Sequence, residues 1–171
     1  MNGDRIGALV SDQVYIEIQR FLNREAALLD RREYQAWFGL TTEDVRYLVM
    51  AQVSRESQVG GLEFALIDED AVGLRARVDQ ISNPKLTHAE NPPTLTRRFI
   101  SSLEVWQGET AGELLARSSI LVYRNRPSSD DGFYVGERRD VLRKVDGNLR
   151  LARREVRLDQ VLLHGPVSTL F

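Results

Sequence analysis

Glu25 is the residue whose position in the sequence most strongly suggests chemistry. At about 100° per residue, a helical wheel gathers a set of apolar side chains into one sector, and Glu25 falls near the centre of that sector. The set is Val14, Ile18, Phe21, Leu22, Leu28 and Leu29. A buried carboxylate must either gain a proton or meet a cation and hydrogen-bond donors. Glu25 is therefore predicted to form a structural ion pair with an arginine of the sheet, or to serve as the acid–base group of a pocket.

Side chains that ligate metals or act as nucleophiles are scarce. The chain contains two histidines, His88 and His164, and no cysteine. Without cysteine there is no disulfide, no thiolate nucleophile, no Cys-type zinc site and no iron–sulfur cluster of the usual kind. Neither histidine has a carboxylate at a spacing that would define a catalytic dyad or a ligand pair, so His88 is predicted to be exposed or capping and His164 to lie in a turn. We expect no catalytic, cofactor-binding or metal-binding residue in this chain.

Basic residues cluster between residues 138 and 157. They are Arg138, Arg139, Arg143, Lys144, Arg150, Arg153, Arg154 and Arg157. Because Glu137 and Asp140 are among the acidic residues interspersed with them, the cluster is predicted to be a solvated face or a subunit contact, where arginine is favoured. The formal net charge of -2 and the pI near 5.8 disfavour a nucleic-acid partner. No apolar run approaches the length of a membrane span and no signal peptide is evident, so a bacterial cytoplasmic protein is expected.

The elements that must position these residues begin with helices. Apolar residues at helical spacing predict a helix over residues 11–29, with Ser11 or Asp12 as its cap. A second, short helix is predicted over residues 33–38, with Trp37 as an apolar anchor, and Asp70 is predicted to cap a third. The third helix would carry Leu74, Val78 and Ile81 on one face. The first part of the chain is therefore predicted to be helical, apart from one strand.

Strands dominate the remainder. They are predicted over residues 44–53, 97–107, 114–124, 133–145 and 149–158. Asp146-Gly147 favours a tight hairpin between the last two, because such turns require positive φ. The three prolines between residues 83 and 93 predict an irregular connection. The order of elements predicts an α+β fold with N-terminal helices and a curved antiparallel sheet, in a single domain over residues 1–171 with a tail of about twelve residues.

The first long strand carries apolar residues on both faces. Strict alternation assigns Phe99, Leu103 and Val105 to one face and Ile100 and Trp106 to the other. One face is expected to meet the helices. The other is expected to meet another subunit, or to line an enclosed pocket.

Several short strings, taken in order, resemble one known family over nearly the whole chain. They are Phe21-Leu22-Asn23-Arg24-Glu25-Ala26, Leu28-Leu29-Asp30, Trp37, Asn91-Pro92-Pro93, Thr96-Arg97-Arg98-Phe99, Tyr123-Arg124-Asn125-Arg126, Gly136-Glu137-Arg138-Arg139-Asp140, Leu158-Asp159-Gln160 and Leu170-Phe171. In this order and spacing the chain resembles the small (β) subunit of bacterial aromatic-ring-hydroxylating dioxygenases of the Rieske type, as found in biphenyl and naphthalene dioxygenases.

The resemblance implies a ketosteroid-isomerase-like cone, also described as a cystatin-like roll, and an assembly role without a catalytic centre. It implies a self-trimer beneath three large (α) subunits in an α3β3 oxygenase, with the Rieske [2Fe-2S] cluster and the mononuclear Fe(II) in the large subunit. The alternative is a stand-alone isomerase, dehydratase or cyclase on the same cone fold. The structural or interface candidates are Glu25, Trp37, Arg98, Trp106, Glu137, Arg138, Arg139, Asp140, Leu170 and Phe171.

Overall fold

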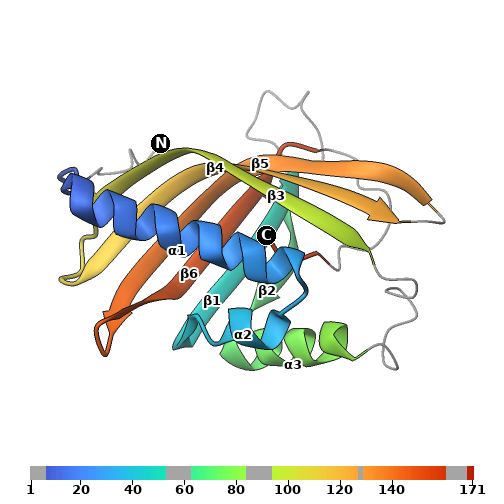
Figure 1. Cartoon of the computed structure of the whole chain (residues 1–171), viewed down its shortest axis with the longest axis horizontal. Coiled ribbons are helices and arrows are strands. Elements are labelled where there is room, and N and C mark those ends of the chain that lie inside the picture. The colour runs from blue at the N-terminus through green and yellow to red at the C-terminus, as the bar shows by residue number, and fades with distance from the viewer. Residues whose placement is uncertain (1–6, 53–62, 84–93, 127–128, 161–168) are drawn as a thin grey trace.

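A curved six-stranded sheet bends around one long helix (Figure 1). The computed structural model describes residues 7–52, 63–83, 94–126, 129–160 and 169–171. Within these residues, no helix has the length and the apolar character that a membrane crossing requires. The predicted α+β class, with helices first and a curved sheet after them, is confirmed.

The long helix α1 spans Asp12–Asp30 and lies across the inner face of the sheet (Figure 1). It begins where the sequence predicts, because the Ser11 side chain accepts a hydrogen bond from the backbone of Val14. The apolar sector of α1 is buried, and Glu25 is buried within it. The helical period thus delivers a carboxylate to the interior of the fold.

Two shorter helices pack together at one end of the sheet (Figure 1). Helix α2 spans Tyr34–Phe38 and buries Trp37. Helix α3 spans Ala71–Ser82, and the Asp70 carboxylate caps it by accepting hydrogen bonds from the backbone of Val72 and Gly73. Its buried face carries Leu74 and Val78, as the sequence predicts.

The sheet has the strand order β2-β1-β6-β5-β4-β3. Its strands are β1 (Thr41–Gln52), β2 (Glu63–Glu69), β3 (Leu95–Gln107), β4 (Glu113–Arg126), β5 (Ser129–Val145) and β6 (Asn148–Leu158). All neighbours are antiparallel except β1 and β6, which pair in parallel. The sheet is therefore mixed rather than wholly antiparallel, and β2 is a strand that the sequence analysis did not predict.

A bulge in β3 corrects the predicted faces of that strand. The pairing with β4 shifts register between Ser101 and Glu104, and Ser102 adopts a φ of 51°. Before the bulge Phe99 is exposed, whereas after it Val105 is buried. Phe99 and Val105 therefore lie on opposite faces, and the assignment by strict alternation is wrong because the bulge inverts the phase of the strand.

The apolar core divides into two clusters along α1. One cluster lies under the first half of the helix and includes Ile18 and Leu22. The other lies under its last turns and includes Leu28, Leu29 and Phe171. Glu25 falls between the two clusters, so any partner for its charge must come from the strands that face this position.

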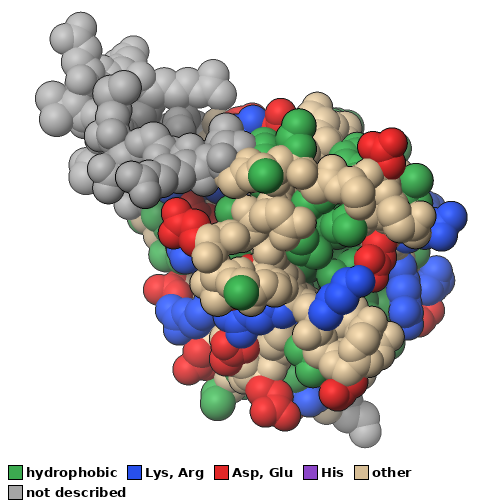
Figure 2. Space-filling model, turned by 90° about the vertical axis from the view of Figure 1, so that its left-hand side faces the viewer, with side chains coloured by type: hydrophobic (Ala, Val, Ile, Leu, Met, Phe, Trp, Pro, Cys, Tyr) green, Lys and Arg blue, Asp and Glu red, His purple; other side chains and the backbone are tan. Residues whose placement is uncertain are grey.

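Charges of both signs share the surface at the end of the molecule where α1 begins. In Figure 2, basic and acidic side chains lie next to one another there, around smaller groups of apolar side chains. One pair that joins α1 to β5 is formed by Lys144 and Glu17, with the Nζ and Oε2 atoms 2.9 Å apart. Such exposed pairs stabilise a fold by less than about 1 kcal/mol each.

Candidate functional site

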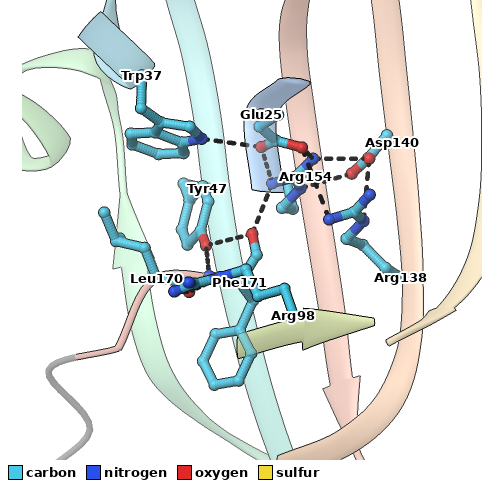
Figure 3. A network of polar contacts seen from close by, with 9 residues as sticks. All are labelled: Glu25, Trp37, Tyr47, Arg98, Arg138, Asp140, Arg154, Leu170 and Phe171. Carbon is cyan, nitrogen blue, oxygen red and sulfur yellow. Dashed lines mark hydrogen bonds and ion pairs between the residues drawn. The ribbon is translucent and has the colours of Figure 1, made fainter. Parts of the chain in front are cut away.

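A network of charged side chains occupies the interior between the two apolar clusters (Figure 3). Glu25 enters it from α1, Arg138 and Asp140 from β5, and Arg154 from β6. Each of these four side chains is at most 1% exposed. Two carboxylates and two guanidinium groups balance in charge, which is the condition under which ionised groups persist in a protein interior.

Arg154 is the centre of the network. Its guanidinium holds both oxygens of Glu25, and the contact from Nη2 to Oε2 measures 2.8 Å. The same group holds both oxygens of Asp140, from Nε and from Nη2, at 2.8 Å each. The Trp37 indole N–H completes the arrangement by donating to Glu25 Oε1 at 2.9 Å. The fork of donors on an arginine matches two carboxylates in this way, and a lysine could not replace it.

These contacts fix the ionisation state of Glu25. Burial by itself raises the pKa of the Glu25 carboxyl, but the charges of Arg154 and Arg138 and the hydrogen bonds from Arg154 and Trp37 outweigh it, and the pKa is lowered. Burial likewise lowers the pKa of Arg154, and the carboxylates of Asp140 and Glu25 more than reverse that effect. Glu25 is therefore ionised at neutral pH and paired on both oxygens.

Arg138 is the least well satisfied member of the network. Its Nε lies 3.2 Å from Asp140 Oδ2, and its Nη1 lies 3.6 Å from Glu25 Oε2. Among the described residues, its Nε and Nη2 atoms make no hydrogen bond. Burial and the neighbouring charge of Arg154 lower the pKa of Arg138. Arg138 thus supplies charge balance more than directed hydrogen bonds.

A second buried ion pair lies beside the network. The Arg98 Nη1 and Asp30 Oδ1 atoms are 2.5 Å apart, and both side chains are at most 9% exposed. Arg98 also donates to the backbone oxygen of Leu170, from Nε at 3.1 Å and from Nη2 at 2.5 Å. A small pocket beside this pair is lined by Tyr34, Ile81, Thr94, Thr96, Arg98, Thr169 and Leu170.

The end of the sequence is bound to the same network (Figure 3). Leu170 and Phe171 are buried against the chain's own sheet. The Phe171 backbone oxygen accepts hydrogen bonds from Arg154 Nη1 at 2.5 Å and from the Tyr47 hydroxyl at 3.0 Å. The Phe171 ring packs edge-on against Tyr134, with ring centroids 5.3 Å apart.

The structure brings most of the predicted site residues together. Seven of them converge in the interior: Glu25, Trp37, Arg98, Arg138, Asp140, Leu170 and Phe171. Trp106, Glu137 and Arg139 do not join them. Glu137 and Arg139 form an ion pair with each other at 2.6 Å on the outer face. Trp106 is half-buried on β3, and the guanidinium carbon of Arg117 on β4 lies 5.5 Å from the centroid of its ring.

The interpretation of the basic cluster as a solvated face or subunit contact is wrong for two of its members. Arg138 and Arg154 point inward and are buried, whereas Arg139, Arg153 and Arg157 lie on the outer face. The strand period separates the two groups, because side chains alternate between the faces of a sheet. Ala152 and Val156 flank Arg154 at a spacing of two, and this signal could have identified it.

Sequence reasoning also missed Tyr47 and left Asp30 without a role. Tyr47 alternates with Val45 and Val49 on the buried face of β1, so its position was predictable but its hydroxyl partner, 124 residues away, was not. His88 and His164 lie outside the described residues. Among the residues that are described, no group of three or more His, Asp or Glu side chains could hold a metal ion.

The outer face of β3, β4 and β5 carries a group of exposed apolar side chains, which we call the outer apolar patch. Leu95, Phe99 and Phe133 are each more than half exposed, and Tyr123 contacts Phe133 with ring centroids 5.4 Å apart. Tyr123 and Phe133 are register partners on β4 and β5. The patch lies on the face of the sheet opposite to Arg98 and the interior.

Comparison with known proteins places this geometry in a family. Residues 24–164 match the model of the family described as "Ring hydroxylating beta subunit". The chain is 34% identical to the beta subunit of biphenyl 2,3-dioxygenase from Rhodococcus jostii (strain RHA1), over 96% of this chain and 92% of that one. It is 31% identical to the beta subunit of benzene 1,2-dioxygenase from Pseudomonas putida, with the same coverage of both chains.

Solved structures share the fold. A structure of naphthalene 1,2-dioxygenase with bound indole superposes with a TM-score of 0.81 at 20% identity, over 98% of this chain and 90% of that one. ActVI-ORFA from Streptomyces coelicolor superposes with a TM-score of 0.59 at 22% identity, over 85% of this chain and 98% of that one. The fold alone is therefore shared more widely, whereas the sequence match is specific. On that match, the chain belongs to the family of ring-hydroxylating dioxygenase beta subunits.

Proposed function

We propose that this chain is a non-catalytic assembly subunit of the terminal oxygenase of an aromatic-ring-hydroxylating dioxygenase. The holoenzyme adds both atoms of O₂ to an aromatic ring and yields a cis-dihydrodiol. The chain forms a trimer that holds three large subunits in register as α3β3. Membership of the beta-subunit family, and relatives named for biphenyl and benzene dioxygenases, support the class of substrate.

The observation that carries the non-catalytic role is the pairing of the interior carboxylates. A general acid or base must reach a proton of the substrate, directly or through one water. Glu25 and Asp140 are each at most 1% exposed, and Arg154 occupies both oxygens of each. The lowered pKa of Glu25 further removes it from the range in which a general base works near neutral pH. Among the described residues, this pairing of the interior carboxylates supports a structural role for them.

The residues of this chain do not fit the Rieske cluster of the oxygenase. A Rieske cluster requires two cysteines and two histidines, and this chain has no cysteine. We therefore assign the Rieske [2Fe-2S] cluster and the mononuclear Fe(II) to the large subunit. If electrons pass between neighbouring large subunits in such an oxygenase, the subunits would have to be held at a fixed separation, and a trimer of this chain would hold them so.

The outer apolar patch is the surface that we assign to subunit contact. Contiguous exposed apolar side chains mark protein interfaces, and aromatic residues are enriched at their centres. Phe99 and Phe133 are more than half exposed, whereas the inner faces of the same two strands bury Arg98, Val105 and Tyr134. The curved sheet therefore presents one face to its own helices and the other to a partner.

Co-expression with the large subunit of the same oxygenase tests the proposal. The two chains are expected to co-purify, and the complex is expected to have the mass of six chains by light scattering. Purified alone, this chain is expected to be colourless and free of iron by elemental analysis. If the chain is a monomer that does not bind the large subunit and that converts a small ketone or polyketide, the proposal is contradicted. That result would favour the stand-alone isomerase or dehydratase.

A further inference from the structure

Leu170 and Phe171 are held by side chains from four strands. Within the described part of the chain, every hydrogen bond of these two residues is made to a side chain and none to a neighbouring strand. The partners are Tyr47 on β1, Arg98 on β3 and Arg154 on β6, and the ring contact is with Tyr134 on β5. This is the geometry of a ligand in a binding site and not that of a strand added to a sheet.

The polar contacts are made to backbone atoms of both Leu170 and Phe171. Arg98 donates two hydrogen bonds to the Leu170 oxygen. Tyr47 donates its hydroxyl proton to the Phe171 oxygen at 3.0 Å and accepts the Phe171 N–H at 2.7 Å. Arg154 adds a second donor to the Phe171 oxygen. The site thus binds the Leu170 carbonyl oxygen, the Phe171 amide N–H and the Phe171 oxygen, in that order along the chain.

The groups that make these contacts are positioned by other residues. Asp30 holds Arg98 through both the side chain and the backbone N–H, at 2.5 and 3.0 Å. Glu25 and Asp140 hold Arg154. These partners come from α1 and β5, so the contacts that orient Arg98 and Arg154 do not involve Leu170 or Phe171. A site whose donors are already oriented loses little conformational entropy on binding.

The aromatic part of the site is also positioned independently. The Tyr134 hydroxyl oxygen accepts a hydrogen bond from Arg124 Nη1 at 2.7 Å. Tyr47 packs edge-on against Trp37, with ring centroids 5.9 Å apart. Phe171, which is fully buried, fills the space beside Tyr134. The pocket for the ring is therefore built from side chains that are themselves anchored elsewhere.

We propose that the interior between α1 and the curved sheet is a preformed binding site for an N-acylated leucyl-phenylalanine unit, and that Leu170 and Phe171 occupy it as an intramolecular ligand. The same site, emptied by truncation, takes such a dipeptide from solution. The proposal concerns this chain alone and does not depend on the role of the chain in an oxygenase.

The test is rescue of a truncated chain. A variant that ends at Thr169 is expected to have a lower Tm than the parent, and N-acetyl-Leu-Phe is expected to raise that Tm in a saturable manner. N-acetyl-Leu-Ala, which lacks the ring, and N-acetyl-Phe-Leu, which reverses the order, are the matched ligands and are expected to have little effect. The full chain, whose site is filled, is expected to show no shift with any of the three.

Phe171→Ala in the full chain keeps the test decisive if the truncated chain does not fold. This variant retains the backbone contacts and leaves a ring-sized apolar cavity, and such cavities bind benzene. Benzene is expected to raise the Tm of Phe171→Ala and not that of the parent. A truncated chain with the Tm of the parent would overturn the proposal, as would a folded truncated chain that N-acetyl-Leu-Phe does not stabilise. If only Phe171→Ala folds, the absence of any effect of benzene would overturn it.

Discussion

Glu25 on α1 and Arg154 on β6 lie 129 residues apart in the sequence and form a bidentate ion pair that is almost completely buried. The pair joins the helix to the middle of the sheet at the point where the apolar core is interrupted. A buried pair of this kind adds little net stability over a well-packed apolar substitute, but removal of one partner strands the other charge. The consequences of breaking it are therefore large and specific.

Glu25→Ala is expected to lower the free energy of unfolding by about 3–5 kcal/mol, because it leaves Arg154 and Arg138 with one carboxylate between them. Glu25→Gln is expected to cost less, since its amide oxygen can still accept from Trp37 and Arg154. Urea unfolding followed by circular dichroism measures both. Glu17→Ala, which removes an exposed partner of Lys144, is the matched control and is expected to cost less than about 1 kcal/mol. Equal stability of all three variants, with loss of an isomerase activity in the Glu25 variants, would make Glu25 catalytic.

The same pair predicts a loss of stability in acid. The pKa of Glu25 in the folded chain lies below its ordinary value of 4.5, so the unfolded chain binds a proton first as the pH falls. The contribution of Glu25 to stability is complete above that value and is lost as the pH falls through the lowered pKa. The difference in unfolding free energy between the parent and Glu25→Gln is expected to shrink from about pH 5 downward. A difference that stays constant from neutral pH into acid would contradict the assignment of charge to Glu25.

The outer apolar patch predicts which surface variants affect assembly. Phe99→Ser and Phe133→Ser are each expected to weaken the complex with the large subunit while the circular dichroism spectrum stays unchanged. Val72→Ser is the matched control, because Val72 is 77% exposed on α3, away from the patch. Light scattering of the co-expressed chains measures the mass of the complex. Retention of full mass in both Phe variants would show that the patch is not the contact surface.

Gly136 is required by the close approach of β5 and β6. A Cβ at this position would lie 2.9 Å from the Arg157 carbonyl carbon and 3.0 Å from the Leu158 Cα atom, and neither backbone atom can move without disturbing the ladder. Gly136→Ala is expected to cost about 1–3 kcal/mol of unfolding free energy. Gly132→Ala, on the same strand, is the control, since its nearest contact would be the Arg124 Cγ atom at 3.6 Å. Thermal unfolding separates the two; equal Tm values would contradict the steric argument.

The sequence predicted those features that depend on residues close to one another along the chain. The helical period identified α1 and the burial of Glu25, and the side chain of Asp70 identified the start of α3. The Asp146-Gly147 turn was predicted from its need for positive φ, and both residues adopt it, at 50° and 76°. Each of these features depends on residues within a few positions of one another.

Features that depend on distant residues were not accessible in this way. The parallel pairing of β1 with β6 joins segments that no hairpin connects, and nothing local to Tyr47 indicates that its hydroxyl binds Phe171. The short strand β2 carries no alternation strong enough to predict it. Arg154 is the intermediate case: its flanking residues indicate its face, but only the fold shows that Glu25 and Asp140 meet it.

The position of β6 determines when this sheet can be completed during synthesis. Among the described strands, β2–β1 is hydrogen-bonded to β5–β4–β3 only through β6, which comes after the other five in the sequence. At roughly 5–20 residues per second, ribosomal synthesis holds α1 and β1 exposed for several seconds before residues 148–158 emerge. During that interval the Glu25 carboxylate has no guanidinium from β6, and β1 has an open edge. Nascent chains of this topology are therefore vulnerable to aggregation until β6 is inserted, and their yield is expected to depend on chaperone capacity.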